Sequence, residues 1–148
     1  MSAEALPRCE FESDRLILKL EATVSASVDS IAPLIDRVLE LAAELNCSAG
    51  REFEIEMALR EALANAVVHG ARNDPDKQIQ LCVACDMQRG MLIIVRDPGE
   101  GFDPASVPSP LVGQNVFSEH GRGIFLINQL MDEVRYERGG TEIHMRKY

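Results

Sequence analysis

The feature that most constrains the fold of this chain is a pair of apolar runs, residues 78–86 and 91–97. They are separated by the turn sequence Met87-Gln88-Arg89-Gly90. Short runs of this kind around a glycine-containing turn predict the two strands of a β-hairpin. Because hairpin strands pair in antiparallel fashion, the run pair argues against a dinucleotide-binding fold, whose strands are parallel.

Further segments complete the predicted element order. A first strand is expected over residues 15–24, and a closing hairpin over residues 133–137 and 141–147 with its turn at Gly139-Gly140. Three segments have the apolar spacing of amphipathic helices: 27–46, with Ser27 or Asp29 as its cap, 51–71 and 123–131. The order strand, two helices, hairpin, loop, helix and hairpin predicts an α+β two-layer sandwich. Helices would cover one face of a mixed, mainly antiparallel sheet.

Length and composition fit a single globular domain. The chain has 148 residues, of which 46% are hydrophobic and 26% charged. No apolar run approaches the roughly 20 residues that span a bilayer. The first residues carry acids and a proline where a signal peptide would have a basic and then apolar start. We expect a cytoplasmic protein in which residues 1–14 form a flexible extension of one domain.

The charge balance is acidic, with 15 Lys and Arg against 24 Asp and Glu and a net charge of −9. Such a surface repels phosphate backbones, so direct binding to nucleic acid or to an anionic membrane is not expected. A basic protein partner, or a metal–nucleotide complex in a locally neutral pocket, remains open.

Two of the four cysteines, Cys82 and Cys85, form a C-x-x-C pair. A zinc site would need a second such pair or two histidines nearby, and the sequence offers neither. Within a strand, residues three apart point to opposite faces, so the two sulfur atoms should diverge. We interpret these cysteines as structural.

A polar stripe runs along the second predicted helix. Glu61, Asn65 and His69 are spaced four residues apart, which places them on one helix face. A carboxylate can serve as a general base, and a carboxamide oxygen is a suitable ligand for Mg²⁺. By itself the stripe is equally compatible with a solvated helix face.

Two glycine-containing segments lie further along the chain. The sequence DPGEG, residues 97–101, directly follows a predicted strand, and GRG, residues 121–123, opens a predicted helix. The first allows close backbone approach to a ligand beside a carboxylate, and the second exposes amide donors suited to a phosphate. The glycine- and proline-rich residues 98–120 between them predict a functional loop.

Taken in order, these segments resemble the GHKL ATPase superfamily. EALANAVVHG, residues 61–70, resembles its N-box, DPGEG its first glycine box, GRG its second, and Gly140-Thr141 its last nucleotide-box element. The compact size and the sequence of residues 123–134 are most similar to the bacterial anti-sigma factor serine kinases. The resemblance runs from about residue 15 to the end and implies a Bergerat-type ATP-binding fold.

The resemblance also implies roles for individual residues. Glu61 would be the catalytic base and Asn65 the ligand of Mg²⁺, which bridges the phosphates of ATP. Asp97 would read the adenine amino group, with Thr141 supporting the base pocket and Gly99 and Gly101 allowing close passage of the chain. Gly121 and Gly123 would offer amides to the phosphates, assisted by Arg122. His69 matches the family pattern without an assigned catalytic step.

Partners follow from the same resemblance. Such kinases phosphorylate an anti-anti-sigma protein, a STAS domain, on serine and sequester a sigma factor or similar target by partner switching, often as homodimers. Residues 102–120 would form the ATP lid, closing over the phosphates from residue 104 onward. The alternatives are a non-catalytic, nucleotide-gated protein-binding module and the ATPase domain of a histidine kinase. The latter is disfavoured because His69, His120 and His144 all follow the first predicted strand.

Overall fold

The computed structural model describes residues 16–86, 90–100 and 119–148, and the side chains of residues 119–122 are not among the described features. The five strands are β1 (Leu16–Ser25), β2 (Gln78–Asp86), β3 (Gly90–Arg96), β4 (Glu133–Glu137) and β5 (Glu142–Lys147). The helices are α1 (Val28–Glu44), α2 (Glu52–Asn65) and α3 (Glu119–Leu130). A π-helical turn, η1 (Ala66–Gly70), extends α2, and a 3₁₀ turn, η4 (Arg138–Gly140), joins β4 to β5.

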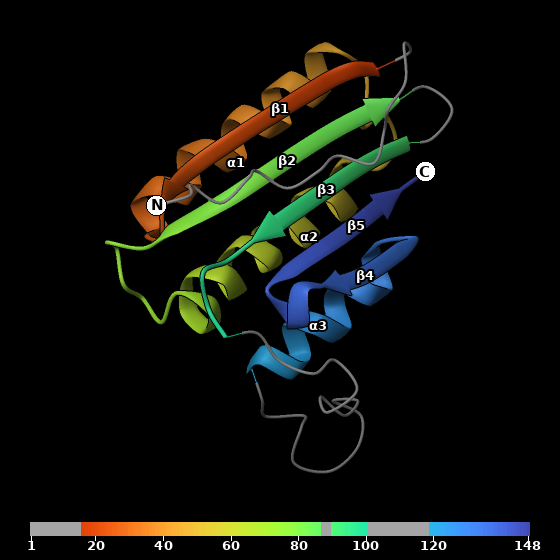
Figure 1. Ribbon diagram of the computed structural model, residues 1–148. Coiled ribbons are helices and arrows are strands. Elements are labelled where there is room, and N and C mark those ends of the chain that lie inside the picture. The colour runs from red at the N-terminus through yellow and green to blue at the C-terminus, as the bar shows by residue number, and fades with distance from the viewer. Residues whose placement is uncertain (1–15, 87–89, 101–118) are drawn as a thin grey trace.

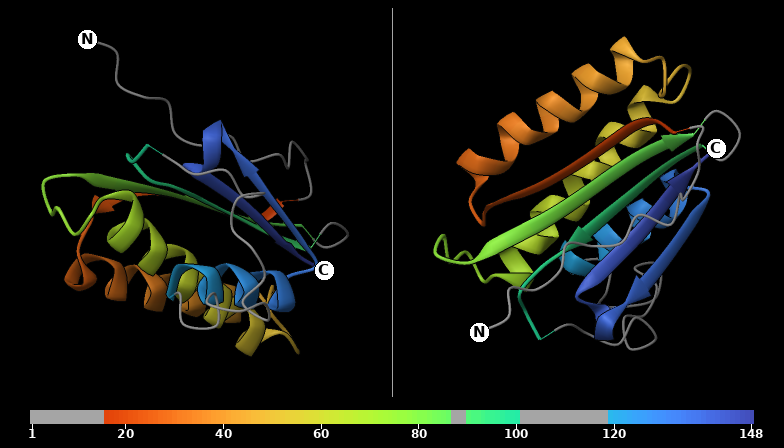
Figure 2. Two further views of the ribbon diagram at one scale, coloured as in Figure 1. Left: turned by 90° about the horizontal axis from the view of Figure 1, so that it is seen from below. Right: turned by 45° about the horizontal axis from the view of Figure 1, so that its top comes forward.

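The strands form one sheet in the order β1-β2-β3-β5-β4 (Figure 1). All four neighbouring pairs are antiparallel. Figure 2 shows α1, α2 and α3 on the same face of the sheet. The two-layer α+β architecture expected from the sequence is confirmed, and no parallel pair occurs among the described strands.

The first helix begins as its sequence predicts. Ser27 is the N-cap of α1, and its hydroxyl accepts a hydrogen bond from the backbone N–H of Ser30 at 3.2 Å. Pro33 lies in the second turn, close to the N-terminus. The helix buries Ile31, Ile35 and Val38, which share one face at helical spacing.

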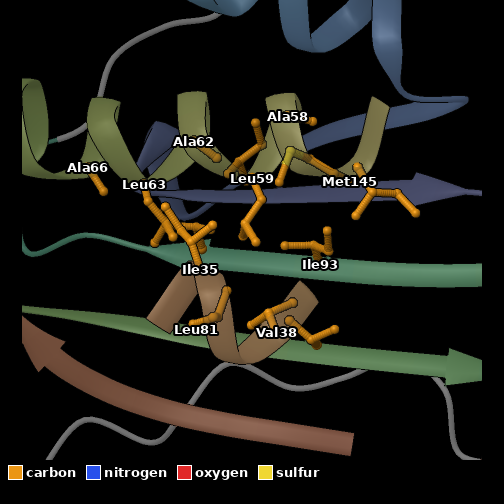
Figure 3. Close-up of a cluster of buried hydrophobic side chains, with 14 of the residues drawn as sticks. Ile35, Val38, Ala58, Leu59, Ala62, Leu63, Ala66, Leu81, Ile93 and Met145 are labelled. Carbon is orange, nitrogen blue, oxygen red and sulfur yellow. The ribbon is translucent and has the colours of Figure 1, made fainter. Parts of the chain in front are cut away.

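The main core lies between the sheet and the helices (Figure 3). Leu59 and Leu63 of α2 have no exposed surface and point toward Ile93 of β3. Each fully buried side chain of this size contributes roughly 1.5–3 kcal/mol relative to an exposed one. This packing fixes α2 rigidly over the centre of the sheet, and α2 carries the polar stripe.

The cysteines of the C-x-x-C pair lie in different apolar clusters. Cys85 belongs to the core under the helices, and Cys82 packs with Ala84, Leu92 and Ile94 in a second cluster. The expected divergence of the two side chains is confirmed. Cys85 is hydrogen-bonded to Cys47, and burial, the largest cause, raises the pKa of Cys85 to about 12. Such a thiol stays protonated, as a structural cysteine would.

Two element boundaries differ from the predictions. The α-helical geometry of α2 ends at Asn65 rather than continuing to residue 71. α3 begins at Glu119, four residues before the predicted start, so Gly121 and Arg122 lie inside its first turn. The predicted lid, residues 102–120, lies outside the described residues except for Glu119 and His120. In the described part of the chain, no helix is long and apolar enough to cross a membrane.

Candidate functional site

A pocket opens between the end of α2, the ends of β3 and β5, and α3. Asn65, His69 and Gly70 contribute from the helix side, and Asp97 and Thr141 from the sheet side. The floor and walls are aliphatic or aromatic side chains, namely Ala62, Ala66, Val95, Ile124, Ile127, Tyr136 and Ile143. An apolar pocket with a few convergent polar groups is the usual form of a small-molecule site.

Asp97 provides the acidic group on the sheet side of this pocket. Its backbone N–H donates to the carbonyl of Thr141 at 2.9 Å, which extends the β3–β5 ladder by one rung. Its carboxylate Oδ1 accepts a hydrogen bond from the N–H of Gly99 at 2.8 Å. Burial raises the pKa of Asp97, and the bond from Gly99 opposes that shift. The carboxylate is therefore held in one orientation by its own loop.

Gly70 and Gly99 are needed for the close packing around Asp97. A Cβ built on Gly70 would lie 2.6 Å from Asp97 Oδ1, and one on Gly99 would lie 2.5 Å from the carbonyl oxygen of Gly70. Neither position has room for a side chain. The end of η1 and the loop after β3 thus meet backbone to backbone, which brings the polar stripe to the pocket.

The π-helical turn η1 contains His69, the last residue of the polar stripe, and positions it at the pocket. The N–H of Ala71 bonds to the carbonyl of Ala66 at 2.8 Å, a five-residue spacing that widens the last turn. Arg72 and Asn73 then adopt left-handed backbone angles, with φ of 54° and 60°. Single π turns are common at functional sites, because they redirect the side chains around them. The sequence carried no signal for this turn.

A second hollow lies on the other side of Asn65. It is lined by Glu61, Ala64, Asn65, Val68, His69, Gly123 and Leu126. Asn65 and His69 line both hollows, so the two share a wall. The first hollow has a largely apolar lining that also includes Asp97, Glu100 and Arg72, and the second has a carboxylate and a carboxamide.

Gly123 of α3 fits closely against the polar stripe of α2. A Cβ at this position would lie 2.9 Å from Glu61 Oε2 and 3.3 Å from Asn65 Nδ2. The missing side chain is what allows α3 to approach the two polar groups. The sequence analysis predicted Gly123 as an amide donor to phosphate, and its contact with Glu61 and Asn65 was not foreseen.

The structure therefore brings together six of the nine residues predicted for the site: Glu61, Asn65, Asp97, Gly99, Gly123 and Thr141. The backbone of Gly121 and Arg122 lies in the first turn of α3, and Gly101 lies outside the described residues. The roles of all nine residues stay predictions.

Sequence reasoning missed the apolar walls. Tyr136, on β4, lines the pocket, and burial raises its pKa to about 12, so its hydroxyl stays protonated. The alternation of Val134 and Tyr136 with charged residues was the available signal. The sequence predicts Ile124 and Ile127 only as part of the apolar face of a helix.

The fold and the pocket define an α+β domain with a ligand site where α2, β3, β5 and α3 meet. Residues 24–147 match the model of the histidine kinase-like ATPase domain, and the chain belongs to this family. An ATPase domain binds ATP, so membership implies that this chain binds ATP.

The chain is also similar to individual proteins of known name. The chain is 38% identical over 101 residues to the serine-protein kinase RsbW of Staphylococcus epidermidis, and 33% identical over 104 residues to the serine-protein kinase RsbW of Bacillus subtilis. These matches cover 63% and 64% of this chain and 63% of each relative. It is also 30% identical over 117 residues to the anti-sigma F factor of Geobacillus kaustophilus, covering 75% of this chain and 79% of that protein.

Proposed function

We propose that this protein is a cytoplasmic serine kinase of the anti-sigma type. It binds Mg²⁺-ATP, phosphorylates a serine of an anti-anti-sigma STAS domain, and sequesters a sigma factor or a similar regulator by partner switching. The observation that carries this proposal is the convergence of Glu61 and Asn65, Asp97 and Gly123 on two adjoining hollows. The relatives named as serine-protein kinases and as an anti-sigma factor support it.

The first hollow would hold the adenine base. Asp97 accepts a hydrogen bond from the exocyclic amino group, because an ionised carboxylate has only acceptors to offer. Val95, Ile127 and Ile143 supply the flat apolar contacts that a base requires. Thr141, whose carbonyl is bonded to the N–H of Asp97, supports this end of the pocket, and Gly99 lets the loop pass close to the base.

The second hollow would hold the phosphates. Asn65 would hold Mg²⁺ through its carboxamide oxygen, because Mg²⁺ prefers oxygen ligands and is typically bound by few protein groups. Gly121 lies in the first turn of α3, where backbone N–H groups lack partners within the helix and favour an anion, and Arg122 adds a positive charge. When bound, Mg²⁺ supplies neutralisation of phosphate charge.

Glu61 would act as the general base. The hydroxyl oxygen of the partner's serine attacks the γ-phosphorus of ATP, its proton passes to the Glu61 carboxylate, and ADP leaves as the bond between the γ-phosphorus and the bridging oxygen breaks. Glu61 is half-buried at the hollow's wall and is accessible to an incoming side chain. We also propose that the protein works as a homodimer.

The test measures phosphorylation of STAS-domain proteins encoded in the same genome. Each candidate is incubated with the protein and Mg²⁺-ATP, and the addition of one phosphate is followed by intact mass. Transfer by the wild type that is lost in Glu61→Ala and in Asn65→Ala supports the kinase. An exposed variant on the same helix, Glu56→Ala, serves as the matched control and should retain transfer.

Other outcomes contradict the proposal. Tight binding of ATP without phosphorylation of any candidate would leave a nucleotide-gated binding module as the better account. Transfer to a histidine of a companion protein would indicate the ATPase domain of a histidine kinase.

A further inference from the structure

A row of charged and polar side chains crosses the sheet on the face opposite the helices. In the strand register, Arg96 of β3 lies opposite Gln80 of β2 on one side and Glu142 of β5 on the other. Arg96 Nε donates to Glu142 Oε2 at 2.7 Å, and Arg96 Nη1 donates to Gln80 Oε1 at 3.2 Å. The Arg96 and Glu142 side chains are only 8% and 6% exposed.

The second oxygen of Glu142 is held as well. His144 Nε2 lies 2.6 Å from Glu142 Oε1, and His144 Nδ1 lies 3.5 Å from Nη2 of Arg135 on β4. An arginine has only donors, so Nδ1 of His144 accepts and its Nε2–H donates to Glu142. Burial, the largest influence, opposes ionisation of Glu142, but the hydrogen bonds from Arg96 and His144 and the positive charge of Arg96 outweigh burial and lower the pKa of Glu142.

This row stands directly behind the base end of the pocket. Arg96 precedes Asp97, and Glu142 follows Thr141, so the Arg96–Glu142 pair and the bond from Asp97 N–H to Thr141 occupy consecutive positions of one ladder. Val95 and Ile143, the pair on the other side, line the pocket. Any slip between β3 and β5 at Arg96 would therefore move the carboxylate of Asp97.

The charged groups of this row are better suited to fixing the relative position of β3 and β5 than to raising the free energy of unfolding. A buried ion pair gains little net free energy over two apolar side chains of similar volume, because both ions lose their hydration. Its bonds are directional, however, and both oxygens of Glu142 and two nitrogens of Arg96 are engaged. These bonds fix the relative placement of the β3 and β5 ends.

We propose that Arg96 and Glu142, held by Gln80 and His144, are positioning residues that set the base selectivity of the pocket by fixing Asp97. This inference rests on the proposed function, because it presupposes that Asp97 reads the amino group of adenine. The ligand class concerned is the purine nucleoside triphosphate. Neither residue lines the pocket, so both act only through Asp97 and Thr141.

The test compares ATP with inosine triphosphate, which carries a carbonyl oxygen in place of the amino group. Dissociation constants for both are measured by calorimetry on the full chain, for the wild type and for Arg96→Met/Glu142→Leu. The double variant replaces the ion pair by apolar residues of similar size. We expect the wild type to prefer ATP at least tenfold, and the double variant to lose most of that preference while still unfolding cooperatively.

Two further variants keep the test decisive. Glu142→Gln preserves shape and one acceptor, so it should fold even if the double variant does not, and it should reduce the ATP preference about threefold. The matched control, Arg37→Met/Glu40→Leu, removes an exposed Arg–Glu pair of α1 and should leave the preference unchanged.

The outcomes separate the two proposals. A lowered melting temperature with an unchanged ATP preference, in the double variant or in Glu142→Gln, would show a merely structural role and overturn the inference. A wild type that binds neither nucleotide, or binds both equally, would instead overturn the assignment of the pocket.

Discussion

Asp97 shows a conflict between folding and function at the level of one residue. Its proposed role requires an ionised carboxylate, since a protonated one would present a donor to the donor of adenine. Burial raises the pKa of Asp97, which means that the ionised form is the less favourable one in the folded chain. Carrying the charge that the proposed role requires would therefore cost stability, as is common at functional sites.

Replacing this charge should separate stability from binding. Asp97→Asn keeps the acceptor for the N–H of Gly99 but has no net charge. We expect ATP affinity to fall about 5- to 150-fold, which corresponds to the roughly 1–3 kcal/mol lost with a mismatched buried hydrogen bond. At pH 7 and without nucleotide, the variant should be at least as stable as the wild type. Its melting temperature should equal or exceed that of the wild type, and its free energy of unfolding should be higher by at most about 2 kcal/mol.

The pH dependence of the stability difference between Asp97→Asn and the wild type shows whether ionisation of Asp97 causes it. The pKa of Asp97 is raised in the folded chain, so its ionisation lowers the free energy of unfolding at pH values above the folded-state pKa. This cost disappears as the pH falls, first through the folded-state pKa and then through the lower unfolded-state pKa. The difference between variant and wild type should therefore vanish at acidic pH. Thermal unfolding followed by circular dichroism measures it, with the exposed Asp36→Asn as control. A gain that persists at low pH would contradict the assignment to Asp97 ionisation.

Gly123 offers a second prediction at the same scale. Ala has a higher helix propensity than Gly by about 1 kcal/mol, so Gly123→Ala should not destabilise α3 itself. Its Cβ would lie 2.9 Å from Glu61 Oε2, which must swing away. We expect phosphate transfer to fall at least tenfold, with ATP affinity and melting temperature changing much less. Unchanged transfer would show that the position of Glu61 is not critical, and Asn128→Ala on the exposed face of α3 is the control.

At the scale of elements, the sequence predicted the strands better than the helix ends. Both hairpins and the first strand were found within one or two residues, because turn residues and apolar runs mark strands locally. The end of α2 and the start of α3 were wrong by four or more residues. Both ends lie at the pocket, where contacts distant in sequence, such as Gly70 with Asp97, decide the backbone geometry.

The candidate site likewise has some features that local sequence marks and others that depend on contacts distant in sequence. The motif residues were predictable because each has a chemistry that stands out among its neighbours, as Asn65 does in a helix of Leu and Ala. The apolar walls, including Tyr136, were not, because an apolar residue facing a ligand has the same pattern as one facing the core. The Arg96–Glu142 pair depends on strand register, which no single segment encodes.

The packing of η1 against the loop after β3 can be tested by a substitution at Gly70. Gly70→Ala would place its Cβ 2.5 Å from Asp97 Cβ, so one of the two segments must move. We expect a loss of about 1–3 kcal/mol in the free energy of unfolding, typical of overpacking, together with a tenfold or greater loss of ATP affinity. Denaturant unfolding and calorimetry measure the two effects.

Gly50→Ala is the matched control for this substitution. Gly50 has a φ of 81°, and no heavy atom lies within 4 Å of the place that a Cβ would occupy, so the change costs backbone strain without a clash. It should destabilise the fold and leave ATP affinity unchanged. If Gly70→Ala behaved in the same way, the packing of η1 against the loop would have no part in shaping the site.

At the scale of the whole molecule, four separate chain segments meet to form the site. Glu61 and Asn65 come from the helical layer, Asp97 and Thr141 from the end of the sheet, and Gly123 from α3. The core between the layers keeps α2 in register with β3, and the ladder between β3 and β5 keeps Asp97 beside Thr141. Nucleotide binding and global stability should therefore be linked, since ATP binds only the assembled arrangement.

The net charge of −9 governs a last property of the whole molecule. Exposed ion pairs such as Arg37–Glu40 and Arg60–Glu56 contribute little individually, whereas nine excess acids repel one another throughout the folded chain. Salt weakens both effects, and the repulsion is the larger. We expect the melting temperature without nucleotide to rise by several degrees between about 20 mM and 300 mM NaCl, over which the Debye length falls from above roughly 20 Å to below roughly 6 Å.

The charge-reversal variant Glu44→Lys provides the check on this interpretation. It changes the net charge from −9 to −7, because one negative charge is replaced by one positive charge. Its exposed position at the end of α1 is far from the core contacts that hold the site. A lysine there would also favour the helix C-terminus, so the absolute melting temperature is less informative than its slope with salt. A smaller slope in the variant is expected, and a melting temperature that falls with salt in the wild type would show that ion pairs, not repulsion, dominate the surface electrostatics.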